Sequence, residues 1–169
     1  MFKIKTKSGH SLVEMLIYVG ILSIVSILVV STLLSFTKSY RDLGALRIVE
    51  HSGINSMERM IRDITNTTVV DVANSSFDTN PGVLTIIATA NSVSTTTKFY
   101  VENNILKVNV NGIYSGPLSL SNASISNLVF KQLDSGISKA IKIDMTIQGV
   151  VGGIIKTRSF HSTVILTGL

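Results

Sequence analysis

The sequence of 169 residues contains no cysteine. This absence excludes a disulfide framework, a cysteine-ligated metal and a thiol nucleophile. The three histidines, His10, His51 and His161, stand far apart and do not have the spacing of a metal site or a catalytic cluster. No serine lies in the Gly-x-Ser-x-Gly pattern of a nucleophile elbow. We therefore expect a protein that is not an enzyme, with no catalytic residues, no bound metal and no cofactor.

Charge is absent from residues 15–37, a run of 23 residues without Asp, Glu, Lys or Arg. A helix of about 20 mostly apolar residues crosses the apolar part of a bilayer. A conventional secretory signal has a shorter apolar region, about 7–15 residues, followed by a cleavage site of small residues. Because this run is longer, we expect a transmembrane helix over residues 10–37.

Glu14 stands at the head of the uncharged run. A carboxylate in a membrane span costs on the order of 2–3 kcal/mol or more unless a cation pairs with it. Its presence therefore indicates a partner cation. A plain signal anchor, with a glutamate that reaches to the membrane interface, is the alternative, but it does not explain the glycine five positions upstream.

The residues around Glu14 resemble the prepilin leader and N-terminus of the type IV pilin and pseudopilin superfamily. The match consists of Lys7-Ser8-Gly9, then His10-Ser11-Leu12-Val13-Glu14, then the uncharged run. The resemblance implies that prepilin peptidase cleaves between Gly9 and His10 and methylates the new amine of His10, although the family more often has Phe or Met there. It also implies that Glu14 pairs with the terminal amine of a neighbouring subunit during filament assembly.

The same resemblance implies partners and a location. The partners are prepilin peptidase, other pilins or pseudopilins of a hetero-oligomeric filament, an inner-membrane assembly platform and membrane lipid. The precursor would cross the inner or plasma membrane once, with residues 1–9 in the cytoplasm and the C-terminal domain outside, and would then enter a filament in the periplasm or at the cell surface. Charge bias alone does not fix this orientation, because Lys38, Arg41 and Arg47 match the three lysines of the leader.

Beyond residue 37, apolar residues recur at helical spacing, which predicts an amphipathic continuation of the helix over residues 38–66. Gly44 and Gly53 each weaken this helix by about 1 kcal/mol relative to alanine. The apolar positions are Leu43, Leu46, Val49, Ile54, Met57, Ile61 and Ile64.

Residues 67–169 favour strands. Apolar and polar residues alternate with a period of two, most clearly over residues 141–148. Asn103-Asn104 and Asn111-Gly112 predict two-residue hairpin turns, and the polar stretch 91–97 predicts a mobile loop.

The predicted fold class is α+β. It comprises a leader (1–9), a transmembrane helix (10–37), its amphipathic continuation (38–66) and a β-rich globular domain (67–169), with the long helix packed on an antiparallel β-sheet as in pilins.

A second, shorter resemblance lies at the junction of helix and sheet. Residues 56–64, Ser-Met-Glu-Arg-Met-Ile-Arg-Asp-Ile, resemble the Arg-Asp segment of the J-type minor pseudopilins of type II secretion and of the W-type minor pilins. This implies a minor pilin-like subunit of a type IV pilus or of a type II secretion pseudopilus. Two alternatives stay open: a subunit of a DNA-uptake (competence) pilus, and a single-pass anchored binding or adhesin domain that does not polymerise.

Calcium and DNA are two possible ligands, but the residues that suggest them have simpler explanations. Asp71, Asp78 and Asn80 could supply oxygen ligands to calcium, but Asn-Pro-Gly already indicates a turn. DNA could contact a basic patch with aromatic stacking surfaces, but the formal net charge of +5 falls to +2 without the three leader lysines. The residues of that patch are Arg59, Arg62, Lys98, Phe99, Tyr100 and Lys107. We interpret them as parts of a solvated helix face and a solvated strand.

Overall fold

The computed structural model describes residues 11–90, 92–134 and 139–166. The chain divides into two compact units, residues 1–40 and 41–169, which are described separately. One helix, α1 (Leu12–Thr65), supplies the described part of the first unit beyond residue 11 and continues into the second.

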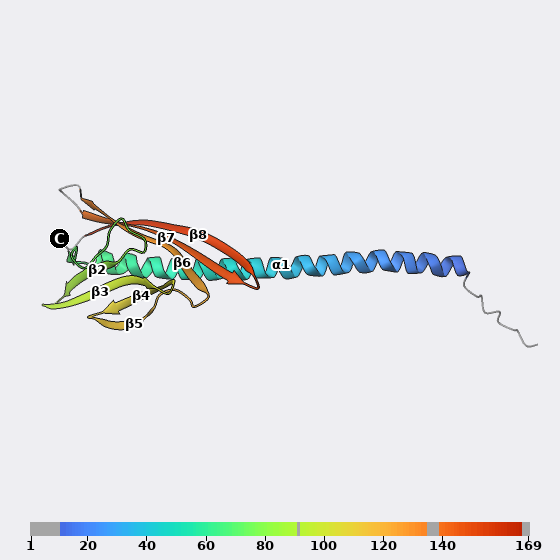
Figure 1. Cartoon of the computed structure of the whole chain (residues 1–169), viewed down its shortest axis with the longest axis horizontal. Coiled ribbons are helices and arrows are strands. Elements are labelled where there is room, and N and C mark those ends of the chain that lie inside the picture. The colour runs from blue at the N-terminus through green and yellow to red at the C-terminus, as the bar shows by residue number, and fades with distance from the viewer. Residues whose placement is uncertain (1–10, 91, 135–138, 167–169) are drawn as a thin grey trace, which may run out of the picture. The chain divides into compact units, whose positions relative to one another are not determined.

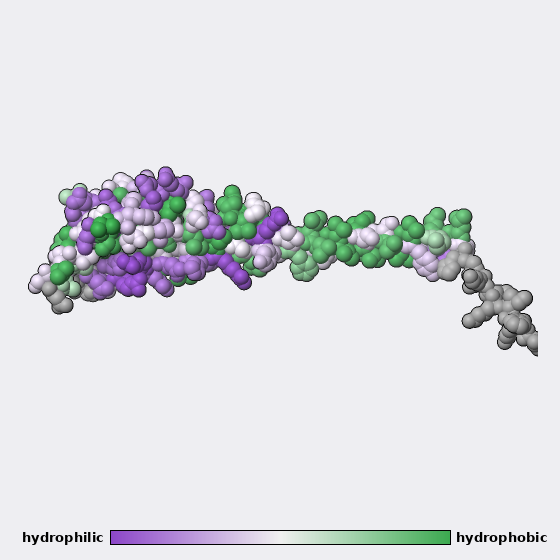
Figure 2. All heavy atoms as spheres, turned by 90° about the horizontal axis from the view of Figure 1, so that it is seen from below, coloured by the Kyte–Doolittle hydropathy of each residue, from purple (hydrophilic) through white to green (hydrophobic). Residues whose placement is uncertain are grey.

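In the first unit, the helix exposes all its residues from 15 to 40 and is long and apolar enough to cross a membrane. Figure 2 shows a nearly continuous apolar surface along it. Five of the hydroxyl groups on this surface donate to backbone carbonyls about one turn earlier, as Ser23 does to Val19 (2.8 Å) and Thr32 to Leu28 (2.8 Å). Because these donors are satisfied within the helix, they need no water. The predicted apolar helix of membrane-spanning length is therefore confirmed.

The described residues of the second unit form eight strands in two antiparallel sheets (Figure 1). The five-stranded sheet has the order β1-β2-β3-β4-β5 and the three-stranded sheet the order β6-β7-β8. The strands of the first are β1 (Val69–Val70), β2 (Leu84–Ala90), β3 (Val93–Glu102), β4 (Ile105–Val110) and β5 (Ile113–Pro117). Those of the second are β6 (Ala123–Asp134), β7 (Lys139–Val151) and β8 (Ile154–Ile165).

One hydrophobic core joins the second part of α1 to both sheets. The alternation over residues 141–148 holds, because Ile141, Ile143, Met145 and Ile147 are all fully buried. The α+β class and the helix packed on antiparallel strands are thus confirmed, with the strands divided between two sheets. The remaining core side chains come mainly from α1 (Val49, Met57, Met60, Ile64), the five-stranded sheet (Leu84, Ile86, Phe99, Leu106, Val108) and β6 (Ala123, Ile125, Leu128, Phe130).

Both predicted hairpin turns are present. Asn103 and Asn104 have φ of 53° and 60°, and Asn111 and Gly112 have φ of 52° and 78°. A third turn, at Gly152-Gly153 between β7 and β8, was not predicted; its φ values of 55° and 83° require the same left-handed conformation.

The mobile loop predicted over residues 91–97 is wrong for most of its length, because β3 begins at Val93. Thr95 pairs with Ala88 and Thr97 with Ile86. Threonine is β-branched and fits a pleated surface well, so a polar composition did not exclude a strand. Residue 91 lies outside the described residues.

The predicted apolar stripe of α1 is only partly correct. Leu43, Leu46 and Ile54 are 56%, 37% and 46% exposed. The buried positions instead include small residues, Ala45, Ser52, Gly53 and Ser56. The reason is a close approach of strand to helix: a Cβ built on Gly149 of β7 would lie 2.8 Å from the carbonyl oxygen of Ala45. Large side chains do not fit there, so they occupy the outward face.

Candidate functional site

The predicted cleavage residue Gly9 and the predicted methylation residue His10 lie outside the described residues, which begin at residue 11. Glu14, the residue predicted to act in filament assembly, is described. It lies in the first turn of α1, where the helix dipole favours a negative charge.

Glu14 has one partner in the described part of the first unit. The hydroxyl of Tyr18 donates a hydrogen bond to Oε1 of Glu14, at 3.0 Å. The two residues are four positions apart on α1, and helical side chains lean toward the N-terminus, so Tyr18 reaches back over the turn that carries Glu14. Sequence analysis did not single out Tyr18. The signal that could have found it is this spacing of four residues on one helix face.

The hydrogen bond from Tyr18 leaves the Glu14 carboxylate able to accept further donors. A phenol donates one hydrogen, whereas a carboxylate has about four acceptor positions. The carboxylate therefore keeps most of its accepting capacity, including Oε2, for a further donor. Because it stands among exposed apolar side chains, a cation would be a strongly favoured partner if lipid surrounded this part of the helix.

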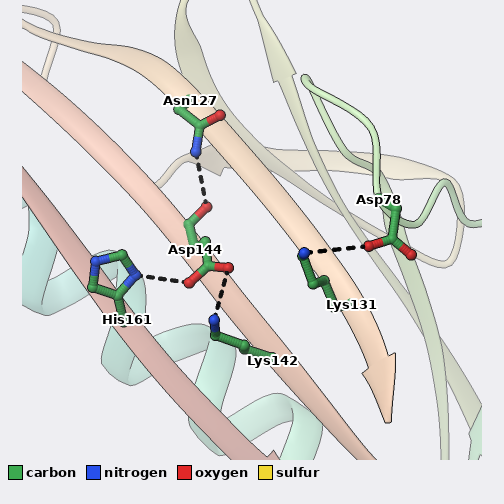
Figure 3. A network of polar contacts seen from close by, with 6 residues as sticks. All are labelled: Asp78, Asn127, Lys131, Lys142, Asp144 and His161. Atoms are coloured by element: carbon green, nitrogen blue, oxygen red, sulfur yellow. Dashed lines mark hydrogen bonds and ion pairs between the residues drawn. The ribbon is translucent and has the colours of Figure 1, made fainter.

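The three proposed calcium ligands have separate neighbours. Asp71 accepts hydrogen bonds from the backbone and side-chain nitrogens of Asn74 (3.2 and 2.7 Å), which lower the pKa of its carboxyl. Oδ1 of Asn80 accepts from the backbone of Leu128 at 3.1 Å, and Asp78 lies 3.7 Å from Lys131 (Figure 3). In the described ranges, no group of three or more His, Asp or Glu side chains could hold a metal ion.

The loop that carries Asp78 and Asn80 instead pairs with the outer edge of β6. The amides of Asp78 and Gly82 donate to the carbonyls of Phe130 (2.9 Å) and Leu128 (2.7 Å). With the Asn80 contact, these bonds satisfy backbone groups that an edge strand would otherwise leave open.

The structure divides the residues of the DNA hypothesis, which we considered weaker than a solvated surface. Tyr100 and Lys107 are register partners on neighbouring strands, but Phe99 is fully buried in the core and offers no stacking surface. The alternation of a strand explains this, because Phe99 points inward while its neighbours point outward. Lys107 pairs with Glu102, whose hydrogen bond raises the pKa of the lysine, and Nζ of Lys107 lies 5.4 Å from the centre of the Tyr114 ring. Arg59 pairs with Asp63 at 2.7 Å.

A polar cluster centred on Asp144 occupies the outer face of the three-stranded sheet (Figure 3). Nδ1 of His161 lies 2.7 Å from one carboxylate oxygen of Asp144, and Nζ of Lys142 lies 3.3 Å from the other. The hydrogen bond with His161 is the main cause of a lowered pKa at Asp144, and Lys142 adds to it. The cluster links neighbouring strands, since Asp144 and His161 are register partners of β7 and β8.

The site that the described residues offer is therefore Glu14, held by Tyr18 on an apolar helix. Comparisons of the chain with protein-family models, with curated proteins and with solved structures gave no match.

Proposed function

We propose that the chain is a minor pilin-like subunit, processed by prepilin peptidase and assembled into a type IV pilus or a type II secretion pseudopilus. The observation that carries this proposal is the position of Glu14. It is a single carboxylate in the first turn of an exposed apolar helix, with one neutral hydrogen-bond donor beside it. Such a group has a large free-energy incentive to acquire a cation.

In the proposed mechanism, cleavage between Gly9 and His10 creates that cation. The new amine, methylated at His10, pairs with Glu14 of an adjacent subunit, while its own Glu14 receives the amine of the next. Until then, the Tyr18 hydroxyl supplies part of the stabilisation that the carboxylate loses in lipid. The pair thus serves the subunit in the membrane and leaves acceptor positions for assembly.

Small residues on the helix suit close packing against other pilin helices. A Cβ on Gly20 would meet nothing within 4 Å, and the hydroxyl of Ser23 is already bonded to its own helix. Such positions let two helices approach closely without burying an unsatisfied polar group.

The outward face of α1 in the second unit also favours assembly over an isolated anchored domain. Leu43, Leu46 and Ile54 are exposed, while Ser52 and Ser56 are 1% and 0% exposed. Apolar side chains on the open face of a helix gain free energy only when a further surface covers them. Neighbouring subunits of a filament would provide that surface.

The first experiment tests processing. The full precursor is expressed with and without a prepilin peptidase, and the membrane-extracted chain is measured by intact mass spectrometry. We expect a peptidase-dependent product that begins at His10 and carries about 14 Da more when methylated. A chain that keeps residues 1–9 in the presence of the peptidase would support the anchored, non-polymerising domain instead.

A second experiment tests the role of Glu14. In cells that carry the matching filament machinery, Glu14→Ala should leave cleavage intact and reduce incorporation into filaments more than 100-fold, because loss of one partner of a buried ion pair costs about 3–5 kcal/mol. The matched control is Glu58→Ala, at an exposed position of the same helix in the second unit. Normal incorporation of the Glu14 variant would contradict the pairing.

A further inference from the structure

The turn between β7 and β8 is unusually apolar. We call residues 150–155 the hairpin tip; it comprises Val150, Val151, Gly152, Gly153, Ile154 and Ile155. Val150 and Ile155 are register partners directly opposite each other, and they are 48% and 61% exposed. Hairpin turns are normally rich in Asn, Asp, Gly and other polar residues. Four β-branched apolar residues around one turn therefore indicate an apolar contact.

The hairpin tip is fixed to the beginning of the second unit. A Cβ on Gly152 would lie 2.8 Å from Cδ of Arg41, and the Val151 methyl groups lie about 3.6–3.7 Å from the position that a Cβ of Gly44 would take. Lys156, directly after the tip, pairs with Asp42 at 3.1 Å. These contacts hold the tip beside residues 41–44 of α1.

Chain connectivity limits the distance between Arg41, which the tip contacts, and the end of the uncharged run. The uncharged run ends at Thr37, four residues before Arg41. Four residues span at most about 14 Å, even fully extended, and the polar layer on each side of the hydrocarbon core is about 5–8 Å thick. When residues 15–37 cross the membrane, Arg41, beside which the tip packs, is therefore separated from the end of the uncharged run by no more than about 14 Å.

The charges near the tip match an anionic lipid surface. Lys38, Arg41 and Arg47 lie within ten residues of the end of the uncharged run, whereas Lys156, which flanks the tip, is already paired with Asp42. A basic residue near an anionic bilayer favours the bound state by about fivefold, and its aliphatic stem can lie in the apolar layer while its charge stays at the headgroups.

We propose that the hairpin tip is a membrane-docking element, which inserts Val150 and Ile155 into the interfacial layer of an anionic bilayer while the span anchors the chain. This inference rests on the transmembrane helix and not on filament assembly. Failure of cleavage or of Glu14 pairing would not contradict membrane docking of the tip. Failure of membrane docking would not contradict cleavage or Glu14 pairing.

The absence of cysteine allows a direct test with single-cysteine variants of the full chain in lipid vesicles. Ile155→Cys places an environment-sensitive fluorophore at the tip. Thr163→Cys is the matched control, since it lies on the same strand and the same face and is exposed, about 27 Å further along β8. Quenching by a lipid with a spin label at headgroup depth is compared with quenching by aqueous acrylamide. The vesicles contain phosphatidylcholine alone or with phosphatidylserine.

We expect the label at residue 155 to be quenched by the spin-labelled lipid and sheltered from acrylamide, and the label at residue 163 to show the reverse. Phosphatidylserine should increase the protection at residue 155 by about fivefold for each basic residue that engages the surface. Equal acrylamide quenching at both positions would overturn the proposal. Protection that rises with the protein-to-lipid ratio would also overturn it, because a second copy of the chain would then be the covering partner. Val150→Cys, on the partner strand, repeats the measurement if the first variant does not fold.

Discussion

Two glycines of α1 should respond in opposite directions to the same substitution. Gly44 and Gly53 both lie in the helix of the second unit, and glycine in a helix interior costs about 1 kcal/mol relative to alanine. Their surroundings differ. A Cβ on Gly44 would make ordinary contact with Val151 at 3.6 Å, whereas a Cβ on Gly53 would lie 2.1 Å from Cζ of Phe160.

The magnitudes follow from these distances. Gly44→Ala gains helix propensity without a clash, so the free energy of unfolding should rise by about 1 kcal/mol. Gly53→Ala gains the same propensity, but it must displace a ring that packs against the core, and overpacking of this kind costs about 1–3 kcal/mol. The Gly53 variant should therefore be less stable than the Gly44 variant by about 1–3 kcal/mol.

The assay is chemical unfolding of the full chain in detergent micelles, followed by the circular dichroism of the β-sheets. A third variant, Phe160→Ala, provides the control. In that background the ring is absent, so Gly53→Ala should be stabilising, as Gly44→Ala is. Equal stabilisation by both substitutions in the presence of Phe160 would refute the conclusion that Gly53 is needed for close packing of β8 on the helix.

Two further predictions concern polar pairs. Tyr18→Phe should increase incorporation into filaments about threefold, the average value of a side-chain hydrogen bond within a membrane protein, because Glu14 then lacks its partner before the amine arrives. Cleavage should be unchanged, and Tyr40→Phe, at a 79% exposed position of the same unit, is the control and should behave as wild type. Asp144 has a lowered pKa through its hydrogen bond with His161, so its stabilisation is complete above pH 3.8 and is lost as the pH falls through the lower, folded-state pKa. Asp144→Asn should therefore be less stable than wild type in urea unfolding at pH 7, and the difference should shrink as the pH falls below 3.8; a difference that does not shrink as the pH falls would contradict this cause.

Much of the fold could be predicted because local signals agreed with the tertiary structure. The strand predicted from the alternation over residues 141–148 is correct, because one face of β7 is buried along most of its length. The two asparagine-containing turns were predictable because few residues other than glycine tolerate a positive φ. Glu14 was identifiable because charge is so rare in an apolar run that a single carboxylate stands out.

The error in the apolar stripe of α1 arose because packing distance, and not hydrophobicity alone, decides which residue is buried. Leu43 and Ile54 fit the helical period, but β7 approaches α1 closely at Ala45 and Val49, and Phe160 of β8 does so at Gly53. The sequence analysis also missed Tyr18, which lies four residues after Glu14 on the same helix. Many residues of a helix are spaced four apart, so this spacing alone does not predict a hydrogen bond. The spacing of Tyr18 and Glu14 becomes informative only because the Glu14 carboxylate needs a donor in an apolar run.

The docking of the hairpin tip and the pairing of Glu14 act in opposite directions on assembly. In the proposed assembly, a subunit that enters a filament would give up the lipid contacts of its span, and those of Val150 and Ile155 with them. Covering of Leu43, Leu46 and Ile54 by neighbouring subunits would compensate part of that loss. The rest would have to come from the proposed ion pair at Glu14, because helix packing replaces one apolar environment with another and gains little from the hydrophobic effect. Serine at residues 150 and 155 should therefore shift subunits from the membrane to the filament, whereas alanine at residue 14 shifts them back.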